Sequence, residues 1–214
     1  IGNLEMGRLT KDGVTFYNLD GDQIEKEKTE IKWDAEAAEK GGFEHFMMKE
    51  IHEQPRAVKD TLNSVLKDGK FDLTDIGLAE EDIRRTSQIY IVACGSAYHV
   101  GMVAQYVIED LVKIPVRVEL ASEFRYRKPI LDPNGLVIII SQSGETADSL
   151  AALRETKAQG IRTLGIVNVV GSSIAREADK VFYTLAGQEI SVATTKAYST
   201  QRWLLTSLQF SLPK

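Results

Sequence analysis

The sequence predicts an α/β fold, a doubly wound parallel sheet between two helical layers in a flavodoxin-like three-layer sandwich. From about residue 88 onward, apolar segments of strand length alternate with amphipathic segments of helical length. The apolar segments, such as LVIII at residues 136–140, lack period-two alternation, which indicates a sheet covered on both faces. Helices separate consecutive strands, as parallel pairing requires.

Each element of this region follows from its local pattern. We expect strands at residues 88–93, 116–120, 136–140, 162–167 and 180–185. We expect helices from about residue 96 to 114, and at 122–126, 147–158, 172–178 and about 193–208. Gly160 follows the third of these helices and is predicted to end it.

The first 33 residues have a different pattern. Two turn signals, Asp12-Gly13 and Asp20-Gly21, flank alternating segments such as VTFYNL, which predicts short antiparallel β hairpins. So short a stretch cannot hold a core alone. We therefore interpret residues 1–33 as the last hairpins of a larger sheet.

Residues 34–74 have apolar residues at helical spacing and are predicted to form a helical linker. Gly41-Gly42 and Pro55 interrupt the pattern, so we expect two helices, with Gly69 as a C-terminal stop. The linker leads into the α/β domain, residues 75–214.

Composition excludes several function classes. A formal net charge of -5 over 214 residues disfavours non-specific binding of nucleic acid. No apolar run reaches the length of a membrane span, and nothing at the start resembles a signal peptide. Cys94 is the single cysteine, which excludes an internal disulfide and fits a reducing, cytoplasmic compartment. The chain begins with Ile1, so we expect a processed product or a piece of a longer protein.

The functional signal lies where the predicted strands end, because ligands of doubly wound sheets bind beyond the carboxyl ends of the strands. The four ends read CGSA (94–97), SQSGET (141–146), NVVGSS (168–173) and QEISVATT (188–195). Three of them cluster Ser, Thr and Gly. One such turn would be explained by helix capping alone, but several along one sheet edge favour a ligand site.

The SQSGET turn is predicted to bind phosphate. A helix N-terminus has unpaired N–H groups and a positive partial charge, both of which attract an anion. Hydroxyl and amide groups here can donate to phosphate oxygens, and a glycine permits close approach of the backbone. The candidate residues are Ser141, Gln142, Ser143, Gly144 and Thr146. We expect Glu145 to point away, because its carboxylate would repel a phosphate.

Other chemistries receive less support. The spacings of the nucleotide P-loop and of the dinucleotide fingerprint are absent, which disfavours a generic nucleotide-binding domain. His45, His52 and His99 stand at no metal-ligand spacing, so we expect neither a metal nor a cofactor. A catalytic Cys94–His99 pair is a weaker interpretation than a small buried thiol. The basic run RYRK at 125–128 could reach a phosphate, although such runs are more often ion-paired.

Several longer motifs resemble one family. The segments CGSAYHVGMVAQY, ELASEFRYRKP, SQSGETADS, NVVGSSIAREAD and EISVATTKAYSTQ are similar to the first sugar isomerase (SIS) domain of glutamine–fructose-6-phosphate aminotransferases (isomerising), the glucosamine-6-phosphate synthases. KGGFEHFMMKEIHEQP resembles the segment that joins their glutaminase and isomerase domains. The resemblance implies that residues 1–33 end a glutaminase domain and that residues 75–214 are the first SIS domain.

The resemblance also implies a ligand and a site. The family binds fructose 6-phosphate or glucosamine 6-phosphate, and glucose 6-phosphate is a further candidate; the pathway is amino-sugar and cell-wall precursor synthesis. The implied phosphate ligands are Ser141, Gln142, Ser143 and Thr146, the implied sugar contacts are Cys94, Gly95 and Ser96, and the implied closing residues are Val192, Ala193 and Thr194. Many members have threonine then serine where this chain has Ser96 then Ala97, so Ala97 is a doubtful ligand.

The family's catalytic groups have no counterpart that we can assign. Its glutaminase nucleophile is an N-terminal cysteine, and its isomerase glutamate, histidine and Schiff-base lysine belong to a second SIS domain and the tail. We therefore expect this chain to bind sugar phosphate without converting it.

Two further expectations concern partners and function class. SIS domains of this family pair, so we expect a homodimer and partial exposure of the predicted helices 96–114 and 193–208, including Trp203, Leu204, Leu205 and Leu208. The alternative function is a non-catalytic SIS module that senses a sugar phosphate. Such a regulator would carry a helix-turn-helix, whereas residues 1–33 are predicted to be β hairpins.

Overall fold

A computed structural model describes residues 1–27, 39–72 and 80–208, and its contacts divide the chain into two compact units, Ile1–Lys32 and Trp33–Lys214. In the first unit, β1 (Met6–Thr10), β2 (Gly13–Tyr17) and β3 (Gln23–Ile24) form an antiparallel sheet in the order β1-β2-β3. None of its described residues is buried. The predicted hairpins are therefore present, and they enclose no core of their own.

The second unit is built on a five-stranded parallel sheet. Its strands are β6 (Ile89–Ala93), β7 (Val116–Leu120), β8 (Leu136–Ser141), β9 (Arg162–Val167) and β10 (Lys180–Tyr183). The order is β10-β9-β8-β6-β7, and every pair is parallel. This is the flavodoxin-like order, in which the winding direction reverses between β6 and β8. The predicted fold class is confirmed.

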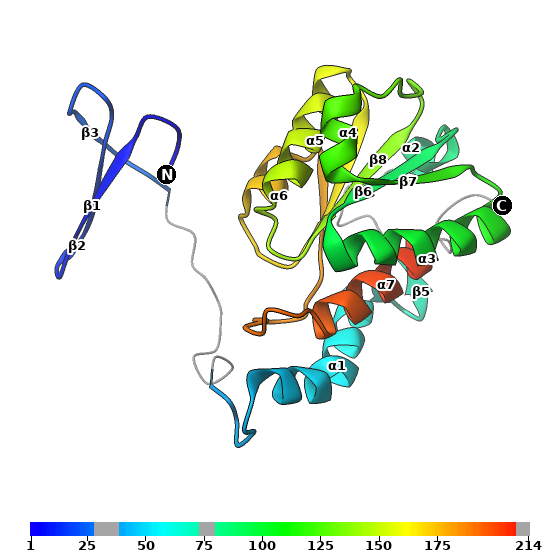
Figure 1. Ribbon diagram of the computed structural model, residues 1–214, viewed down its shortest axis with the longest axis horizontal. Coiled ribbons are helices and arrows are strands. Elements are labelled where there is room, and N and C mark those ends of the chain that lie inside the picture. The colour runs from blue at the N-terminus through cyan, green and yellow to red at the C-terminus, as the bar shows by residue number, and fades with distance from the viewer. Residues whose placement is uncertain (28–38, 73–79, 209–214) are drawn as a thin grey trace. The chain divides into compact units, whose positions relative to one another are not determined.

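Helices cover both faces of this sheet (Figure 1). One face packs against α3 (Gly95–Val112) and α7 (Lys196–Leu208), and the other against α4 (Ala121–Arg127), α5 (Ala147–Ala158) and α6 (Ser173–Glu177). The strands supply both cores, because successive side chains point to opposite faces: Ile91 belongs to the α3–α7 core and Val92 to the α4–α6 core. All residues of β6 and β8 are buried, which explains their continuous apolar sequence.

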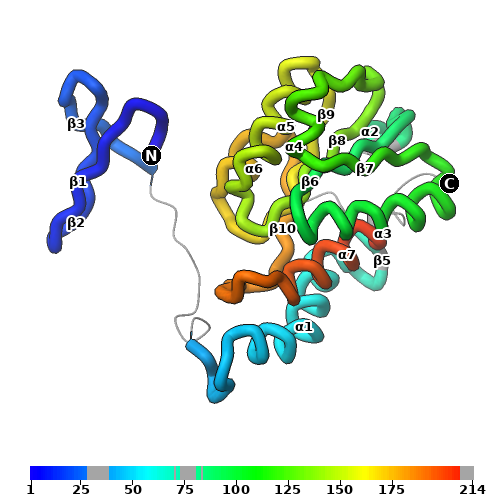
Figure 2. The backbone as a smooth tube through the Cα atoms, viewed as in Figure 1, coloured from blue at the N-terminus to red at the C-terminus, as the bar shows by residue number. Residues whose placement is uncertain are grey.

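The segment before the sheet forms α1 (Phe46–Asn63), a small hairpin of β4 (Leu66–Lys67) and β5 (Lys70–Phe71), and α2 (Glu80–Arg84). Helix α1 packs against α7, so it forms an outer layer beyond the helices that touch the sheet (Figure 2). The hairpin and α2 have no counterpart in the predicted elements. Gly69 lies in the hairpin turn at φ +73°, and does not terminate a helix.

The prediction of two helices separated near Pro55 is wrong, because Pro55 lies inside the single helix α1. Proline lacks the N–H that would bond to the carbonyl four residues earlier, here that of Ile51. The side-chain amide of Gln54 donates to the Ile51 carbonyl at 3.2 Å instead. The neighbouring glutamine thus satisfies the acceptor that the proline leaves open.

The expected exposure of the last helix is correct for Trp203 and wrong for two leucines. Leu204 and Leu205 are buried in the α3–α7 core, while Trp203 is about half exposed. The side chain of Leu208 lies outside the described residues. On α3, Met102 and Tyr106 are exposed at a spacing of one helical turn, as expected for that helix.

Candidate functional site

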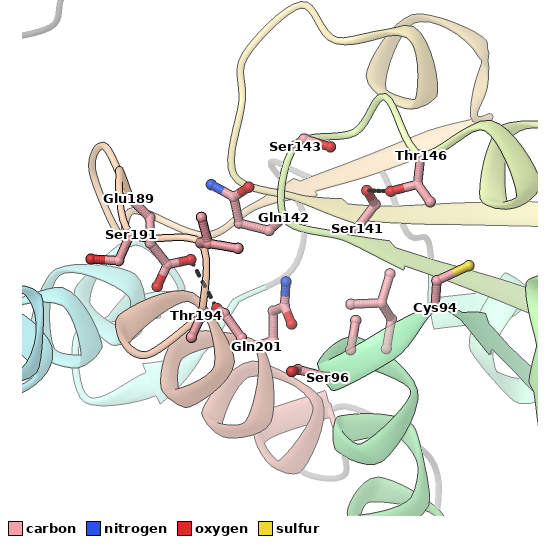
Figure 3. A pocket seen from close by; sticks show the side chains of 14 residues that line it. Cys94, Ser96, Ser141, Gln142, Ser143, Thr146, Glu189, Ser191, Thr194 and Gln201 are labelled. Carbon is pink, nitrogen blue, oxygen red and sulfur yellow. Dashed lines mark hydrogen bonds between the residues drawn. The ribbon is translucent and has the colours of Figure 1, made fainter. Parts of the chain in front are cut away.

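A cavity of about 350 Å³ lies at the carboxyl ends of β6 and β8, where the winding direction reverses (Figure 3). This is the position at which doubly wound sheets hold their ligands. The cavity is lined by Cys94, Ser96, Ala97, Ile140, Ser141, Gln142, Ser143, Thr146, Glu189, Ser191, Val192, Ala193, Thr194 and Gln201. All predicted site residues except Gly95 and Gly144 belong to this set. Those two glycines shape the backbone beside it.

The turn at residues 141–146 is held by its own hydroxyl groups. Ser141 Oγ accepts a hydrogen bond from the Gly144 N–H at 3.0 Å and lies 2.9 Å from Thr146 Oγ1. Ser143 Oγ accepts from the Glu145 N–H at 3.2 Å. No side-chain hydrogen bond caps the N-terminus of α5, although Thr146 occupies the cap position. The hydroxyls thus order the turn in front of the positive end of a twelve-residue helix, rather than capping that helix.

Gly144 allows the turn to meet the next strand-to-helix connection. Its φ is +66°, and a Cβ at this position would lie 2.0 Å from Ser172 Oγ. The Gly144 carbonyl accepts from the Ile174 N–H at 3.0 Å, and Glu145 Oε1 accepts from the Ser173 N–H at 2.6 Å. The expectation that Glu145 points away from the cavity is confirmed, because its carboxylate lies at the start of α6.

The opposite wall is the loop of residues 190–195, which Glu189 organises. Its Oε1 accepts from the N–H of Thr195 at 2.7 Å and of Ala197 at 3.3 Å, and its Oε2 accepts from Thr194 Oγ1 at 2.8 Å. An acidic group at this place stabilises a helix N-terminus. It explains why α7 begins at Lys196, three residues later than the pattern predicted.

Helix α1 holds the same loop from the other side. The buried Glu50 accepts hydrogen bonds through Oε1 from the N–H groups of Ile190, at 2.6 Å, and Ser191, at 3.1 Å. Lys196 donates to Glu53 Oε2 at 2.6 Å, and this ion pair is largely buried. The segment that the sequence presents as a linker is therefore part of the cavity's support.

No lysine or arginine is among the described residues that line the cavity, and Glu189 is its charged member. Both arginines of the basic run at 125–128 are ion-paired: Arg125 lies 2.6 Å from Asp148, and Arg127 lies 2.5 Å from Glu119. The hydrogen bond to Asp148 raises the pKa of Arg125 above its usual value. An anion in the cavity would consequently be held by neutral hydrogen-bond donors and by the positive N-terminal end of α5.

Cys94 lines the cavity beside Ser149, whose hydroxyl donates to the thiol sulfur at 3.8 Å. His99 lies on the exposed side of α3, where its ring contacts Tyr98 edge-on. This placement disfavours a catalytic Cys94–His99 pair. Cys94 packs against the α4–α6 core but is only partly buried, so the expectation of a buried thiol is not met. Within the described ranges, no three His, Cys, Asp or Glu side chains are grouped so that they could hold a metal ion. None of the described helices is long and apolar enough to span a membrane.

Five lining residues were absent from the prediction: Ala97, Ile140, Glu189, Ser191 and Gln201. Ala97, a doubtful ligand from the sequence, contributes a methyl group to the wall. Glu189 and Ser191 lie within the polar segment QEISVATT, residues 188–195, which follows β10. The signal that could have identified Gln201 is its place at helical spacing among the apolar residues Ala197, Leu204 and Leu205.

Comparisons with known proteins agree with this geometry. The family model "SIS domain" matches residues 82–209. The glutamine–fructose-6-phosphate aminotransferase (isomerising) of Clostridium acetobutylicum is 59% identical over 90% of this chain and 32% of its own length. The corresponding protein of Caldanaerobacter subterraneus is 55% identical over 98% of this chain and 35% of its own length. The chain thus spans about a third of these curated relatives.

A solved structure of an aminotransferase domain is similar to this chain in three dimensions. The C-terminal domain of glucosamine-fructose-6-phosphate aminotransferase from Francisella tularensis has a TM-score of 0.77 and 46% identity to this chain. The match covers 80% of this chain and 48% of that one. Since the family model matches more than half of its residues and the fold agrees, the chain belongs to the SIS domain family.

Proposed function

We propose that this chain is the sugar-phosphate-binding part of an isomerising glutamine–fructose-6-phosphate aminotransferase, with fructose 6-phosphate and glucosamine 6-phosphate as its ligands and glucose 6-phosphate as a further candidate. The observation that carries the proposal is the polar cavity at the β6–β8 switch point, which the SQSGET turn lines directly before α5 begins. Relatives that carry this enzyme name are more than half identical to the chain, which supports the choice of ligand.

In this proposal the phosphate lies against the turn of residues 141–146. Hydroxyl groups and backbone N–H groups there donate to its oxygens, and the positive end of α5 favours its charge. The sugar extends between the start of α3, with Cys94, Gly95 and Ser96, and the loop with Val192, Ala193 and Thr194. Cys94 would provide packing there, and its reduced thiol fits a cytoplasmic protein.

The proposed domain organisation follows the similarity to the glutamine–fructose-6-phosphate aminotransferases. Residues 1–33 would be the last strands of a glutaminase domain, residues 34–74 a helical linker, and residues 75–214 the first SIS domain. The amine transfer and the shift of a proton between C1 and C2 need a nucleophile and an acid/base pair. We assign neither to this chain, and we propose that it binds sugar phosphate without turnover.

The test is a titration of the isotopically labelled chain with fructose 6-phosphate, glucosamine 6-phosphate, glucose 6-phosphate and inorganic phosphate, followed by NMR. We expect amide shifts at residues 141–146 with each sugar phosphate and weaker ones with phosphate. A parallel assay with fructose 6-phosphate and glutamine or ammonia should show no product. Absence of shifts with every ligand would refute the binding proposal, and product formation would refute the proposed lack of turnover.

We also propose that the chain forms a homodimer through the face of α3 and α7. Met102, Tyr106, Leu111 and Trp203 are exposed on these helices, and apolar groups that gather on a surface favour association. Sedimentation velocity at increasing concentration should show a dimer. A monomer at the highest concentration would contradict this proposal.

The alternative function is a module that senses a sugar phosphate without belonging to an enzyme. It would use the same cavity, so binding does not distinguish the two. The identity to aminotransferases over almost the whole chain, including the segment of α1, favours the enzyme.

A further inference from the structure

The residues that line the cavity include one buried amide, that of Gln201. Gln201 lies on α7 and lines the cavity, yet the residue is only 2% exposed. Figure 3 shows its amide nitrogen pointing away from α7, toward the side of the cavity that holds Ser141 and Gln142. The amide therefore lies opposite the phosphate turn.

This amide has an open hydrogen-bonding position. Gln201 Nε2 is one of three buried side-chain polar atoms in the described residues without a partner, together with Glu50 Oε2 and Ser172 Oγ. A buried donor without an acceptor is costly, and such groups in proteins generally meet a ligand or a water molecule. Of the three, Gln201 alone lines the cavity.

The location indicates which part of a ligand the amide would meet. The phosphate turn has its own donors on the β8 side, whereas Gln201 rises from α7 near Ser96 and Thr194 (Figure 3). These are the residues between which the sugar is proposed to lie. An amide offers one donor and one acceptor group, which suits a hydroxyl group that can accept and donate.

We infer that Gln201 is a sugar-recognition residue, whose Nε2 donates to a hydroxyl or carbonyl oxygen of the sugar part of the ligand. The inference rests on the proposed function and deepens it. It implies that Gln201 helps to distinguish a sugar phosphate from inorganic phosphate, which lacks the recognised oxygen. A site with a buried polar group rejects a ligand that leaves this group unpaired.

The variant that tests the inference is Gln201→Met, which keeps the length of the side chain and removes the unpaired amide. We expect the affinity of the full 214-residue chain for fructose 6-phosphate to fall roughly 3- to 10-fold, the contribution of one buried hydrogen bond. The affinity for inorganic phosphate should stay the same. The melting temperature should be unchanged or higher, because the variant removes an unsatisfied polar group.

Gln105→Met is the matched control. Gln105 is an amide on α3 that is already paired, since its Nε2 donates to the Val116 carbonyl at 2.8 Å, and it does not line the cavity. This variant should lower the melting temperature and leave both affinities unchanged. The opposite responses of a paired and an unpaired glutamine separate a ligand contact from a structural role.

A second measurement does not depend on the fold of a variant. The side-chain NH₂ signals of Gln201, identified by their loss in Gln201→Met, should shift when fructose 6-phosphate is added and remain in place with inorganic phosphate. If the wild-type chain binds fructose 6-phosphate while these signals stay fixed and Gln201→Met binds equally well, the inference is wrong and the proposed function stands. If the wild type binds no sugar phosphate, the proposed function fails and the inference fails with it.

Discussion

The two walls of the cavity differ in how far apart in the sequence their hydrogen-bonded residues lie. The turn at 141–146 is ordered by hydrogen bonds between residues two to five positions apart, such as Ser141 with Thr146. The loop at 190–195 is ordered partly by Glu189 nearby, and partly by Glu50, 140 positions from Ile190. The turn at 141–146, against which we propose that the phosphate lies, thus has short-range hydrogen bonds of its own beside those to the start of α6. The loop at 190–195 depends in addition on the distant helix α1.

The difference matters for function because the two walls would respond to different perturbations. A change in the turn should affect every ligand with a phosphate group. A change at α1 should move the loop and alter the binding of the sugar, while phosphate binding is retained. In a longer protein, a segment that precedes the sheet could in this way influence the ligand site.

The largest effect is expected for Gly144→Ala, which disrupts the turn at residues 141–146. The alanine would need a φ of +66°, a strain of about 1–3 kcal/mol, and its Cβ would collide with Ser172 Oγ. Affinity for both fructose 6-phosphate and phosphate should fall at least about tenfold, as a loss of one or more charge-assisted hydrogen bonds implies. Isothermal titration calorimetry and thermal melting measure the two effects.

Gly160→Ala is the control for that variant. Gly160 has a φ of +73°, but an added Cβ would meet nothing within 4 Å. It should therefore carry the backbone strain without the collision, and both affinities should remain as in the wild type. Equal binding by Gly144→Ala and the wild type would show that the turn does not hold the phosphate.

An intermediate effect is expected for Glu50→Ala, which removes the distant support of the loop. Its two hydrogen bonds to Ile190 and Ser191 involve a carboxyl group, and their loss should lower the free energy of unfolding by about 1.5–3 kcal/mol. Affinity for fructose 6-phosphate should fall several-fold, and affinity for phosphate should stay.

The control is Asp60→Ala, an exposed acid on the same helix. It should leave stability and both affinities almost unchanged. If Glu50→Ala lowered the affinities for phosphate and for fructose 6-phosphate equally, the two walls would not act on different parts of the ligand. The comparison between them would then be wrong.

The smallest effect concerns the packing of α6 on α5, the helix that follows the turn at 141–146. Arg154 on α5 pairs with Glu177 on α6 at 2.6 Å. The hydrogen bond from Arg154 holds the pKa of Glu177 below its usual 4.5. The pair therefore stabilises the fold above about pH 4.5, and this contribution is lost as the pH falls through the lowered pKa. The effect is small because the side chain of Arg154 is 59% exposed and that of Glu177 33%, so solvent screens the pair.

This contribution is measured by thermal melting between about pH 3 and about pH 7, a range that includes the titration of carboxylates. The melting temperature of Glu177→Gln should fall less steeply with acid than that of the wild type. Parallel curves for the two proteins would mean that the ion pair contributes nothing to the packing of α6 on α5.

Most of the α/β unit was predictable because its signals are local. Continuous apolar runs specified the strands, and the predicted β7, α5 and β9 have the observed bounds. The errors have physical causes that lie outside the local pattern. Pro55 lies inside α1, where the side chain of Gln54 bonds to the Ile51 carbonyl that the proline leaves open, and α7 starts late because Glu189 caps it.

The sequence alone determined the parallel sheet and the polar turns at its carboxyl edge, including SQSGET. Strand and helix periodicity and helix-terminal chemistry are properties of neighbouring residues. The tertiary structure decided which distant groups complete the site. Glu50 reaches the loop through the packing of α1 on α7, and Gln201 becomes a buried, unpaired donor because α7 covers the sheet beside the cavity. Burial and hydrogen-bond satisfaction depend on contacts between segments far apart in the chain, and those contacts exist only in the folded protein.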